Sequence, residues 1–592
     1  MPVPKDISSN AFLDVEHSLS GRRWVGPSAE VIRQSEAIAQ VTGLADPTAR
    51  VLAQRGVLAD EAESYLTPRL RDLMPDPKTL KDLERAAHRL LQAVEQDEKV
   101  AIFADYDVDG GTSAALLLDW LRHHRKSATL YVPDRIDEGY GPNAPAMQAL
   151  AAAHDLIICV DCGTLSFEAI AAATAADVVI IDHHLAEVEL PDALAIVNPN
   201  RQDETGALAH LCAAAVVFLV LVDANRQCRG ASRDTPDLMS MLDLVALATV
   251  ADVAPLLGLN RAFVMQGLKV MAKRTRPGLV ALADAAGLDA PPEAHHLGYV
   301  IGPRVNAGGR VGRADLGARC LSATDPDEAR AMADRLEEVN RERREIEARV
   351  RDAALTQADA RGLDGPLVWA AGEGWHPGVV GIVAARLKEA TGRPAIVIGL
   401  ENGEGKGSGR SVPGVDLGSA IQKLTSEGLL LKGGGHKMAA GLTVKEPQLE
   451  AAMERLGDLL ARQGAGATGP RDLRIDAVLM PGAASVELVQ QIEAAGPFGQ
   501  GAPAPRFSFP DMQILHAREV GSGHLKISFG DGLGARMDAM AFDGWHSPIG
   551  EALANARGQR FHLAGRLNIN HWGGRRSVQL RLEDAAPATL EP

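Results

Sequence analysis

From residue 83 onward, short apolar runs alternate with segments whose apolar residues recur at helical spacing. The runs are almost continuously apolar, which is typical of strands buried on both faces of a parallel sheet. We expect such strands at Val100–Ala104, Ala128–Val132, Leu156–Val160 and Val178–Ile181. We expect helices at Leu83–Val94, Ala114–Arg122, Ala144–Ala152, Phe167–Ala173 and Leu242–Thr249. The alternation predicts an α/β domain.

A long, mostly charged segment follows. Asp325 is placed to cap a helix, with Pro326 at its first position and Glu328 at its third. One apolar stripe consists of Met332, Leu336, Val339, Ile346 and Val350. A helix reaching about Ala360 would be roughly 50 Å long at 1.5 Å per residue. We interpret it as a strut between two domains; a coiled coil would need repeats that Arg343 interrupts.

The remaining chain divides into a second α/β region and a β-rich region. The former begins with a strand at Leu367–Ala370, and a glycine-rich linker, Gly464–Pro470, ends it. Short strand-like runs then follow at Leu473–Leu479, Arg506–Val520, His524–Phe529, Met537–Phe542, Phe561–Ile569 and Ser577–Leu582, with one helix at Ala484–Ala495. Many short strands suggest a small barrel of the oligonucleotide-binding (OB) type.

These patterns predict an α/β fold class with several domains. Residues 1–80 form an N-terminal segment packing on the core, and residues 81–322 form the parallel-sheet domain. The connecting helix covers residues 323–361, the second α/β domain residues 362–466, and the OB-like β-barrel residues 467–592.

Composition and charge narrow the setting. The 592 residues are 46% hydrophobic, and no apolar stretch is long enough to span a bilayer. Met1–Asp6 leads into no apolar core of a signal peptide, so we expect a cytoplasmic protein that is not associated with a membrane. The net charge of −16 argues mildly against a nucleic-acid binder, but it suits a site made of carboxylates.

The five cysteines do not form a disulfide scaffold in a chain of this size. Cys159 and Cys162 form a C-x-x-C pair, but the first lies in an expected strand and no second pair follows. We therefore interpret them as small buried residues and not as a zinc or redox site.

Acidic residues and histidines follow the expected strands. Asp105, Asp107 and Asp109 come after the first strand; the glycines behind them would allow a tight turn, and Thr112-Ser113 would open the next helix. Asp161 follows the third strand, Asp182-His183-His184 the fourth, and Asp252 a later helix. Ligands of such sheets bind beyond the carboxyl ends of the strands, so these side chains should gather. Oxygen and imidazole ligands suit Mn²⁺ or Mg²⁺. The alternative is ordinary capping aspartates and core histidines.

Several strings match a known family. Asp182-His183-His184, together with DYDVDG (105–110), VDCGT (160–164) and TVADV (249–253), resembles the DHH phosphoesterase superfamily. Within it, the chain resembles the bacterial 5′→3′ exonucleases of single-stranded DNA, with further matches at DEGYG (137–141), GPRVN (302–306), GWHPGVVGIVA (374–384), GSGRS (407–411) and GGGH (433–436). Two positions depart from the pattern. Gly308 stands where alanine is expected, and Phe103 stands where relatives that cleave small phosphate esters carry a histidine ligand.

The resemblance implies roles for these residues. Two divalent cations, Mn²⁺ or alternatively Mg²⁺, would be bridged by Asp161. Asp109, His183 and Asp252 would complete one site, Asp107 and Asp105 the other, and His184 would orient the nucleophile or contact phosphate. Implied substrate contacts are Arg304, Asn306, Arg310, His376, Ser408, Arg410, Gly434, Gly435 and His436. The barrel would offer a nucleic-acid platform at Lys526, Phe529, Arg566, Trp572 and Arg575.

The resemblance also implies an activity. It is the degradation of single-stranded DNA from a 5′ end to 5′-mononucleotides, in DNA repair and recombination, by a monomer working with a helicase and a single-strand-binding protein. One alternative is a nanoRNase or cyclic-dinucleotide phosphodiesterase, for which a C-terminal barrel is superfluous. Another is a non-catalytic DNA-binding scaffold, against which the complete set of acids argues.

Overall fold

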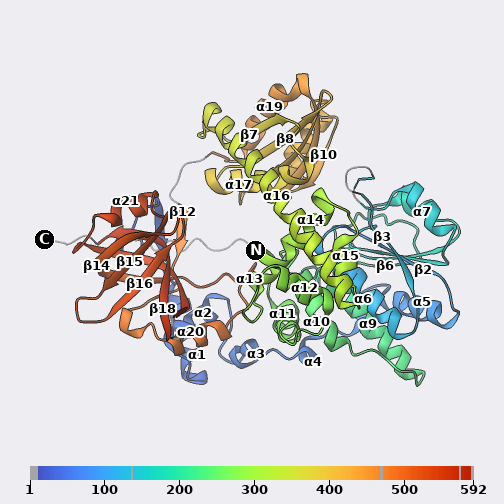
Figure 1. Ribbon diagram of the computed structural model, residues 1–592, viewed down its shortest axis with the longest axis horizontal. Coiled ribbons are helices and arrows are strands. Elements are labelled where there is room, and N and C mark those ends of the chain that lie inside the picture. Colours follow the sequence, from blue (N-terminus) through green and yellow to red (C-terminus); the bar gives the residue numbers. More distant parts are fainter. Residues whose placement is uncertain (1–10, 135–137, 140, 467–470, 573–574, 589–592) are drawn as a thin grey trace. The chain divides into compact units, whose positions relative to one another are not determined.

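The computed structural model describes residues 11–134, 138–139, 141–466, 471–572 and 575–588 (Figure 1). The chain forms two compact units. One comprises Pro75–Ala254 and Phe263–Thr468. The other comprises Met1–Met74, Pro255–Ala262 and Gly469–Pro592. Each unit therefore contains segments that lie far apart in the sequence.

A parallel five-stranded sheet begins the larger unit. Its strands, in spatial order, are β3 (Ala128–Tyr131), β2 (Val100–Ala104), β4 (Leu156–Val160), β5 (Asp177–Ile181) and β6 (Ala195–Val197). The helices around it are α5 (Leu83–Glu95), α6 (Val108–His123), α7 (Ala144–Ala151), α8 (Phe167–Ala171) and α9 (Ala213–Gly230). Every residue of β2 and β4 is buried, as their apolar composition predicts. Figure 1 shows α5, α6 and α9 on one face and α7 on the other. The predicted parallel sheet is confirmed; β6 was not foreseen.

A helical region follows the sheet and ends in a long helix. Its elements are η3 (Leu238–Met241), α10 (Leu242–Ala251), α11 (Gly258–Met271), α12 (Pro277–Ala285), α13 (Ala294–His296), the π-helical turn η4 (Leu297–Ile301), α14 (Gly302–Val311), α15 (Leu316–Leu321) and α16 (Pro326–Arg361). The Asp325 side chain caps α16 by accepting hydrogen bonds from the N–H groups of Asp327 and Glu328. The long helix and its cap are as predicted.

Helix α16 contributes to two packing regions. Near its start, Ala329, Ala333 and Leu336 are fully buried, and the helix packs against α12 and α14. Near its end, Val350 and Ala354 join an apolar core with strands and a helix of the next domain. The helix therefore serves as the strut that the sequence predicts.

That next domain has a mixed five-stranded sheet. In spatial order its strands are β10 (Lys432–His436), β11 (Ala439–Lys445), β9 (Glu404–Arg410), β8 (Ala395–Glu401) and β7 (Val368–Glu373). Its helices are α17 (Pro377–Thr391), α18 (Leu417–Ser426), η5 (Glu446–Gln448) and α19 (Leu449–Arg462). Val379 and Val383 of α17 pack on one face of the sheet, whereas Ile421 of α18 and Leu456 of α19 pack on the other. This is the predicted second α/β domain.

The smaller unit contains a β-barrel. Its strands are β13 (Ala477–Val478), β14 (Phe507–Val520), β15 (His524–Gly530), β16 (Arg536–Ala541), β18 (Arg575–Pro587) and β17 (Arg560–Trp572), and a β14–β17 pairing closes the sheet on itself. Accompanying helices are η6 (Pro481–Ala483), α20 (Val486–Ala494) and α21 (Pro548–Ala554). Closure removes the exposed edges of the sheet.

The N-terminal segment packs on the core of this barrel. Strand β1 (Arg22–Val25) pairs in parallel with β12 (Arg471–Arg474), and the Trp24 indole N–H donates to Asp584 over 3.0 Å. Ile38 and Leu52 join the barrel core cluster. The other N-terminal elements are η1 (Phe12–Asp14), α1 (Ala29–Thr42), α2 (Asp46–Gln54), α3 (Ala62–Leu66) and α4 (Leu70–Leu73), with η2 (Pro77–Thr79) already in the larger unit. The sequence did not indicate this partner, because the paired strands lie about 450 residues apart.

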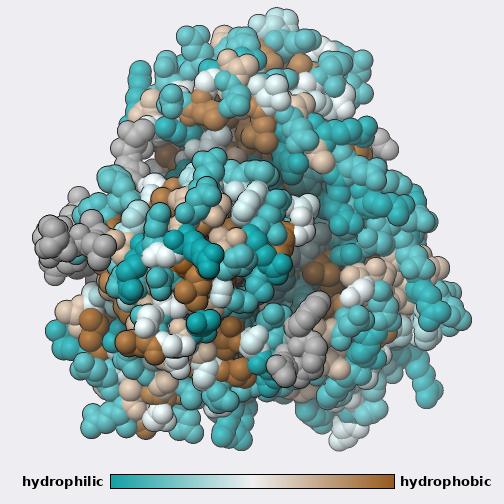
Figure 2. Space-filling view, turned by 60° about the vertical axis from the view of Figure 1, so that its left-hand side comes forward, coloured by the Kyte–Doolittle hydropathy of each residue, from teal (hydrophilic) through white to brown (hydrophobic). Residues whose placement is uncertain are grey.

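Surface hydropathy and helix composition bear on whether the chain could meet a membrane. In the view of Figure 2, hydrophilic side chains dominate the face, and apolar ones form small separate groups. Among the described residues, no helix has the length and apolar character needed to cross a bilayer. All five cysteines are buried and free, as expected for small core residues.

Candidate metal centre and phosphate-binding face

The Asp-rich loop turns directly into helix α6. Strand β2 ends at Ala104 and α6 begins at Val108, with Asp107 as its N-cap. The Asp107 carboxylate accepts hydrogen bonds from the N–H groups of Asp109 (2.9 Å) and Gly110 (3.1 Å). The prediction that Thr112-Ser113 opens the helix is therefore wrong, since both residues lie inside it.

The glycines serve close packing and not a tight turn. A Cβ at Gly110 would overlap the carbonyl oxygen of Asp105, so only glycine fits this position of the helix. The compact start of α6 places the acidic loop against the helix. Asp107 and Asp109 are thus positioned by the start of α6, with Asp105 in the loop directly before it.

Asp109 is anchored by a second helix. Its buried carboxylate accepts hydrogen bonds from the N–H groups of Ala213 (2.6 Å) and Ala214 (2.8 Å), at the start of α9. Burial raises the pKa of Asp109, and the charge of Asp107 adds to the rise, whereas His183 opposes it. This contact could not be foreseen, because the start of α9 is simply apolar in the sequence.

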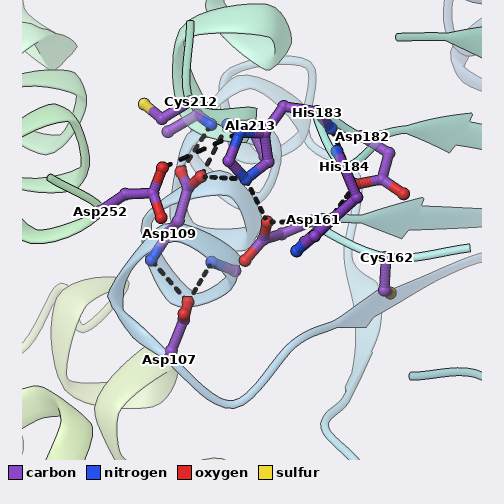
Figure 3. A network of polar contacts seen from close by, with 12 residues as sticks. Asp107, Asp109, Asp161, Cys162, Asp182, His183, His184, Cys212, Ala213 and Asp252 are labelled. Atoms are coloured by element: carbon purple, nitrogen blue, oxygen red, sulfur yellow. Dashed lines mark hydrogen bonds and ion pairs between the residues drawn. The ribbon is translucent and has the colours of Figure 1, made fainter. Parts of the chain in front are cut away.

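Asp161 lies at the middle of the cluster (Figure 3). It adopts a left-handed backbone conformation, with φ of 59°, which is uncommon outside glycine and gathers at functional sites. His183 Nε2 lies 3.3 Å and His184 Nδ1 3.9 Å from its Oδ1, yet that buried oxygen accepts no hydrogen bond from the described part of the chain. Burial and the neighbouring acids, Asp109 first, raise the pKa of Asp161 well above its ordinary value.

Asp182 organises the two histidines. Its carboxylate accepts hydrogen bonds from the N–H groups of Thr164 (3.1 Å) and His183 (2.7 Å), and it lies 2.8 Å from His184 Nδ1. Burial opposes protonation of the His184 imidazole, but the hydrogen bond and charge of Asp182 outweigh it and raise the pKa of His184 to about 9. Sequence reasoning placed Asp182 at a strand end without giving it a role.

Asp252 completes the cluster from the end of α10. Its Oδ2 lies 3.8 Å from His183 Nδ1. Burial, followed by the charges of Asp109 and Asp107, raises the pKa of Asp252 to about 8.

The side chains form three overlapping groups in which ligand atoms lie within 4.8 Å of one another. These groups are Asp105–Asp107–Asp161, Asp109–His183–Asp252 and Asp161–His183–His184. Like charges packed in a buried place raise one another's pKa unless a cation neutralises them. The raised pKa values and the unsatisfied Asp161 oxygen therefore fit divalent cations. The structure brings together all six predicted ligands.

Three predicted substrate residues lie on α14 and make contacts within the protein. The Asn306 side-chain oxygen accepts a hydrogen bond from Val108 N–H over 3.0 Å. The Arg304 guanidinium pairs with Glu337 of α16 and donates to the Val300 carbonyl. Arg310 donates to the Gly378 carbonyl over 3.2 Å.

The other predicted substrate residues lie at the sheet of the second domain. Ser408 and Arg410 belong to β9, and Gly434, Gly435 and His436 to β10. His376 caps α17, with its Nδ1 accepting from Gly378 N–H over 3.0 Å. Residues 407–410 and 433–436 therefore belong to strands, although glycine-rich strings of this kind often form turns. Their glycines make room for neighbours, since a Cβ at Gly409 or Gly433 would crowd Leu417 or Ile421.

The residues predicted to form a platform on the barrel differ in their surroundings. Lys526 pairs with Asp538 and Arg566 with Glu583, each at 2.9 Å. Phe529 is fully buried against Phe509, so it is a core residue and not a base platform. The side chains of Trp572 and Arg575 lie outside the described residues. Phe542, by contrast, is 56% exposed, with the Arg581 guanidinium 5.3 Å from its ring centre.

Three family domains match this chain. The DHH family, N-terminal domain, matches residues 99–249, the DHHA1 domain residues 364–462 and the RecJ OB domain residues 475–584. The single-stranded-DNA-specific exonuclease RecJ of Escherichia coli is 34% identical, over 91% of this chain and 95% of its own length. The chain belongs to the RecJ family. RecJ of Dickeya dadantii is 36% identical over the same shares.

Solved RecJ structures share this architecture. RecJ from Thermus thermophilus in complex with Mn²⁺ superposes with a TM-score of 0.80 at 28% identity, covering 95% of this chain and 79% of that one. A manganese-bound exonuclease RecJ structure, 32% identical with a TM-score of 0.57, covers 67% of this chain and 97% of its own. The RecJ family match confirms the predicted fold class, with its parallel sheet, long helix, second domain and C-terminal barrel.

Proposed function

We propose that this protein is an exonuclease specific for single-stranded DNA. It digests in the 5′→3′ direction and releases 5′-mononucleotides, and it acts in DNA repair and recombination. Membership of the RecJ family supports the substrate class. The observation that carries the proposal is the buried group of acids and imidazoles around Asp161, whose charges demand cations.

The proposed centre uses two divalent cations, Mn²⁺ or alternatively Mg²⁺. When bound, such a pair lowers the pKa of a water and stabilises the attacking and leaving oxygens of a phosphoryl transfer. Asp161 would bridge the pair. Asp109, His183 and Asp252 would hold one cation, and Asp107 and Asp105 the other. Relatives solved with Mn²⁺ and with Mg²⁺ support this choice of ion.

The chain's own side chains would prepare the reaction around that centre. Asp182 holds His184 in its protonated form, so this imidazolium can donate a hydrogen bond to a substrate phosphate oxygen. Two N–H groups of α9 fix the Asp109 carboxylate, so its oxygens need no reorganisation during the reaction. The Asn306 side chain fixes the start of α6 by accepting a hydrogen bond from Val108 N–H.

Direction would follow from recognition of the chain end. A 5′ end differs from an internal site by a terminal phosphate dianion. The Arg410 fork can meet such a phosphate with paired hydrogen bonds, and Ser408, two residues earlier on the same face of β9, can add another. Arg304, Arg310, His376, Gly434, Gly435 and His436 would serve the remaining phosphates.

The barrel would bind the strand beyond the cleavage site. Lys526 and Arg566, which are paired with Asp538 and Glu583, would exchange these acids for phosphates, and the exposed Phe542 ring offers a stacking surface. Phe542 therefore takes the place predicted for Phe529. We further propose a cytoplasmic monomer that acts with a helicase and a single-strand-binding protein.

A labelled-strand assay tests the proposal. Single strands carrying a label at the 5′ or the 3′ end are incubated with Mn²⁺, with Mg²⁺ or with a chelator. We expect labelled mononucleotide to appear at once from the 5′-labelled strand, only with metal, and only later from the 3′-labelled strand. Cleavage confined to dinucleotides would favour the nanoRNase alternative, and metal-independent binding without cleavage would favour the scaffold.

A further inference from the structure

The sheet of the second domain has one face that α17 covers only in part. Along β9, β11 and β10, alternate residues point to this face, and the strand register aligns them in rows. One row contains Arg410, Ala439 and His436, the next Ser408, Gly441 and Gly434, and the third Lys406, Thr443 and Lys432. Only the first two rows contain residues that the sequence assigned to substrate binding.

The middle row forms a flat floor. A Cβ added at Gly434 or Gly441 would meet no heavy atom within 4 Å, so nothing stands above these glycines. A groove of about 600 Å³ runs over this floor, and its lining includes Ser408, Lys406, Lys432 and Arg310. The groove is therefore open, has cationic side chains in its lining and lies close to the predicted phosphate contacts.

The third row carries unbalanced positive charge. Lys406 and Lys432 are both exposed and are the direct cross-strand neighbours of Thr443 on either side. Within the described ranges, neither ammonium group has an acidic partner within 4 Å. On the opposite side of the domain, by contrast, Lys423 of α18 pairs with Glu427 at 3.8 Å. In a chain of net charge −16, two neighbouring lysines without acids beside an open groove indicate an anionic ligand.

We propose that Lys406 and Lys432 form a further phosphate subsite of the nucleic-acid strand. This inference rests on the proposed function, and it adds a position to the phosphate contacts assigned above. The lysine row lies four residues along β9 from Arg410, roughly 13 Å at the rise of a strand. If Arg410 holds the terminal phosphate and the metal centre the scissile one, the lysines hold another phosphate of the same strand. Thr443, between them, can donate its hydroxyl to that phosphate.

Substrates of different length can distinguish the lysine subsite from the sites for the terminal and the scissile phosphate. A 5′-phosphorylated dinucleotide has only the terminal and the scissile phosphate, whereas a trinucleotide or a 12-mer has more. In the double variant Lys406→Ala/Lys432→Ala, we expect KM to rise at least about tenfold on the trinucleotide and the 12-mer. A rise of this size corresponds to the loss of one charge-assisted contact. KM on the dinucleotide and kcat on all three should stay unchanged, and the salt dependence of 12-mer binding should become less steep.

Two controls make the result decisive. Lys423→Ala removes a lysine from the other side of the same domain and should change no parameter. Binding of a labelled 12-mer to Asp161→Asn protein, with and without the lysine changes, measures the subsite independently of cleavage. A KM rise that is equal on the dinucleotide, or no change in 12-mer binding, would overturn the inference while leaving wild-type exonuclease activity intact. If the wild type does not cleave but the lysines still affect 12-mer binding, the proposed function fails and the subsite stands.

Discussion

The side-chain oxygen of Asn306 accepts a hydrogen bond, 3.0 Å long, from the backbone N–H of Val108. Val108 is the first residue of α6, between Asp107 and Asp109. One side chain of α14 therefore supports the start of α6, which carries two predicted metal ligands. The family resemblance assigns Asn306 to substrate phosphates; the geometry gives it a position behind the metal centre.

Replacing Asn306 by alanine should weaken metal binding more than DNA binding. The loss of one hydrogen bond, about 1 kcal/mol, corresponds to roughly a fivefold weaker interaction. We expect the Mn²⁺ concentration for half-maximal activity to rise by about that factor, with little change in KM for DNA. Asn306→Asp keeps the acceptor oxygen and should stay closer to the wild type. A raised KM with an unchanged Mn²⁺ requirement would instead assign Asn306 to the substrate.

Asp161→Asn should abolish most of the activity without unfolding the protein. The change keeps the shape of the side chain, and asparagine accepts the left-handed backbone found here. A residue that binds both cations should matter more than one that only hydrogen-bonds to a metal ligand, and the loss of the latter costs up to about 100-fold. We therefore expect turnover to fall by more than about 100-fold, with an unchanged circular dichroism spectrum. Near wild-type turnover at saturating Mn²⁺ would reject the bridging role.

The metal-free protein should lose stability as the pH rises from 6 to 8. In the folded state the pKa of Asp252 is raised from 3.8 to about 8, and that of His184 from 6.5 to about 9. Between the ordinary and the raised pKa, the folded state keeps a proton that the unfolded state releases, so the unfolding free energy falls with rising pH. For both groups, the contribution to the unfolding free energy is complete at a pH below the ordinary pKa. It is lost as the pH rises through the raised pKa of the folded state.

Thermal unfolding with a chelator measures this effect. We expect Tm to be lower at pH 8 than at pH 6 by a few degrees, since 1 kcal/mol corresponds to about 2–4 °C in domains of 150–250 residues. Mn²⁺ should reduce the difference because cations favour the ionised carboxylates. Asp252→Asn should also reduce it. A metal-free Tm that rises from pH 6 to pH 8 would contradict the assignment.

Arg410→Ala should impair the use of strands that carry a 5′ phosphate. Charge-assisted hydrogen bonds contribute roughly 1.5–3 kcal/mol each, and 1.4 kcal/mol is about tenfold. We expect initial rates at subsaturating concentration to fall at least about tenfold on 5′-phosphorylated strands, and less on 5′-hydroxyl strands. Arg455→Ala, which removes an arginine paired with Glu427 in the same domain, is the matched control. An equal loss on both substrates would mean that Arg410 serves general binding or folding.

Removing the barrel alone should harm the protein more than removing both ends. Deletion of residues 467–592 exposes Ile38 and Leu52, which pack in the barrel core, and takes the Asp584 partner from Trp24. We expect that deletion to aggregate, whereas residues 75–466 should stay soluble and cleave short oligomers. The shorter protein should bind long strands more weakly than the full chain. Equal solubility of the two truncations would contradict the shared core, and equal long-strand affinity would contradict a DNA role for the barrel.

The sequence predicts best what is decided locally. Strands β2 and β4 agree with prediction to the residue, because uninterrupted apolar runs admit few alternatives. Strand β6, with three residues, is too short to give a pattern. The burial of Phe529 could have been predicted, because residues two apart along a strand share a face. Phe529 therefore lies on the same face of β15 as the core residues Leu525 and Ile527. Its aromatic ring suggested a base platform, whereas its position in this alternation decides its burial.

Glycine-rich segments misled the prediction. Gly110 sits in a helix, and Gly407 and Gly409 sit in a strand, because neighbouring groups approach their Cα atoms more closely than a side chain allows. From the sequence alone, this requirement cannot be distinguished from a turn.

The positions of the acids followed from the rule that ligands bind at the carboxyl ends of strands. The hydrogen bonds that hold Asp109 and Val108, however, come from helices about 100 and 200 residues away.

The parallel pairing of β1 with β12 also sets an order of events during synthesis. Arg22 is aligned with Arg471, so the first strand of the barrel unit cannot find its partner until about 450 further residues have been made. At roughly 5–20 residues per second, that delay is on the order of 20–90 s. During this time Trp24, Ile38 and Leu52 lack the core that buries them, while the two α/β domains between them can already fold. The N-terminal segment is thus made long before its partner strand and is among the last parts of the described chain to become native.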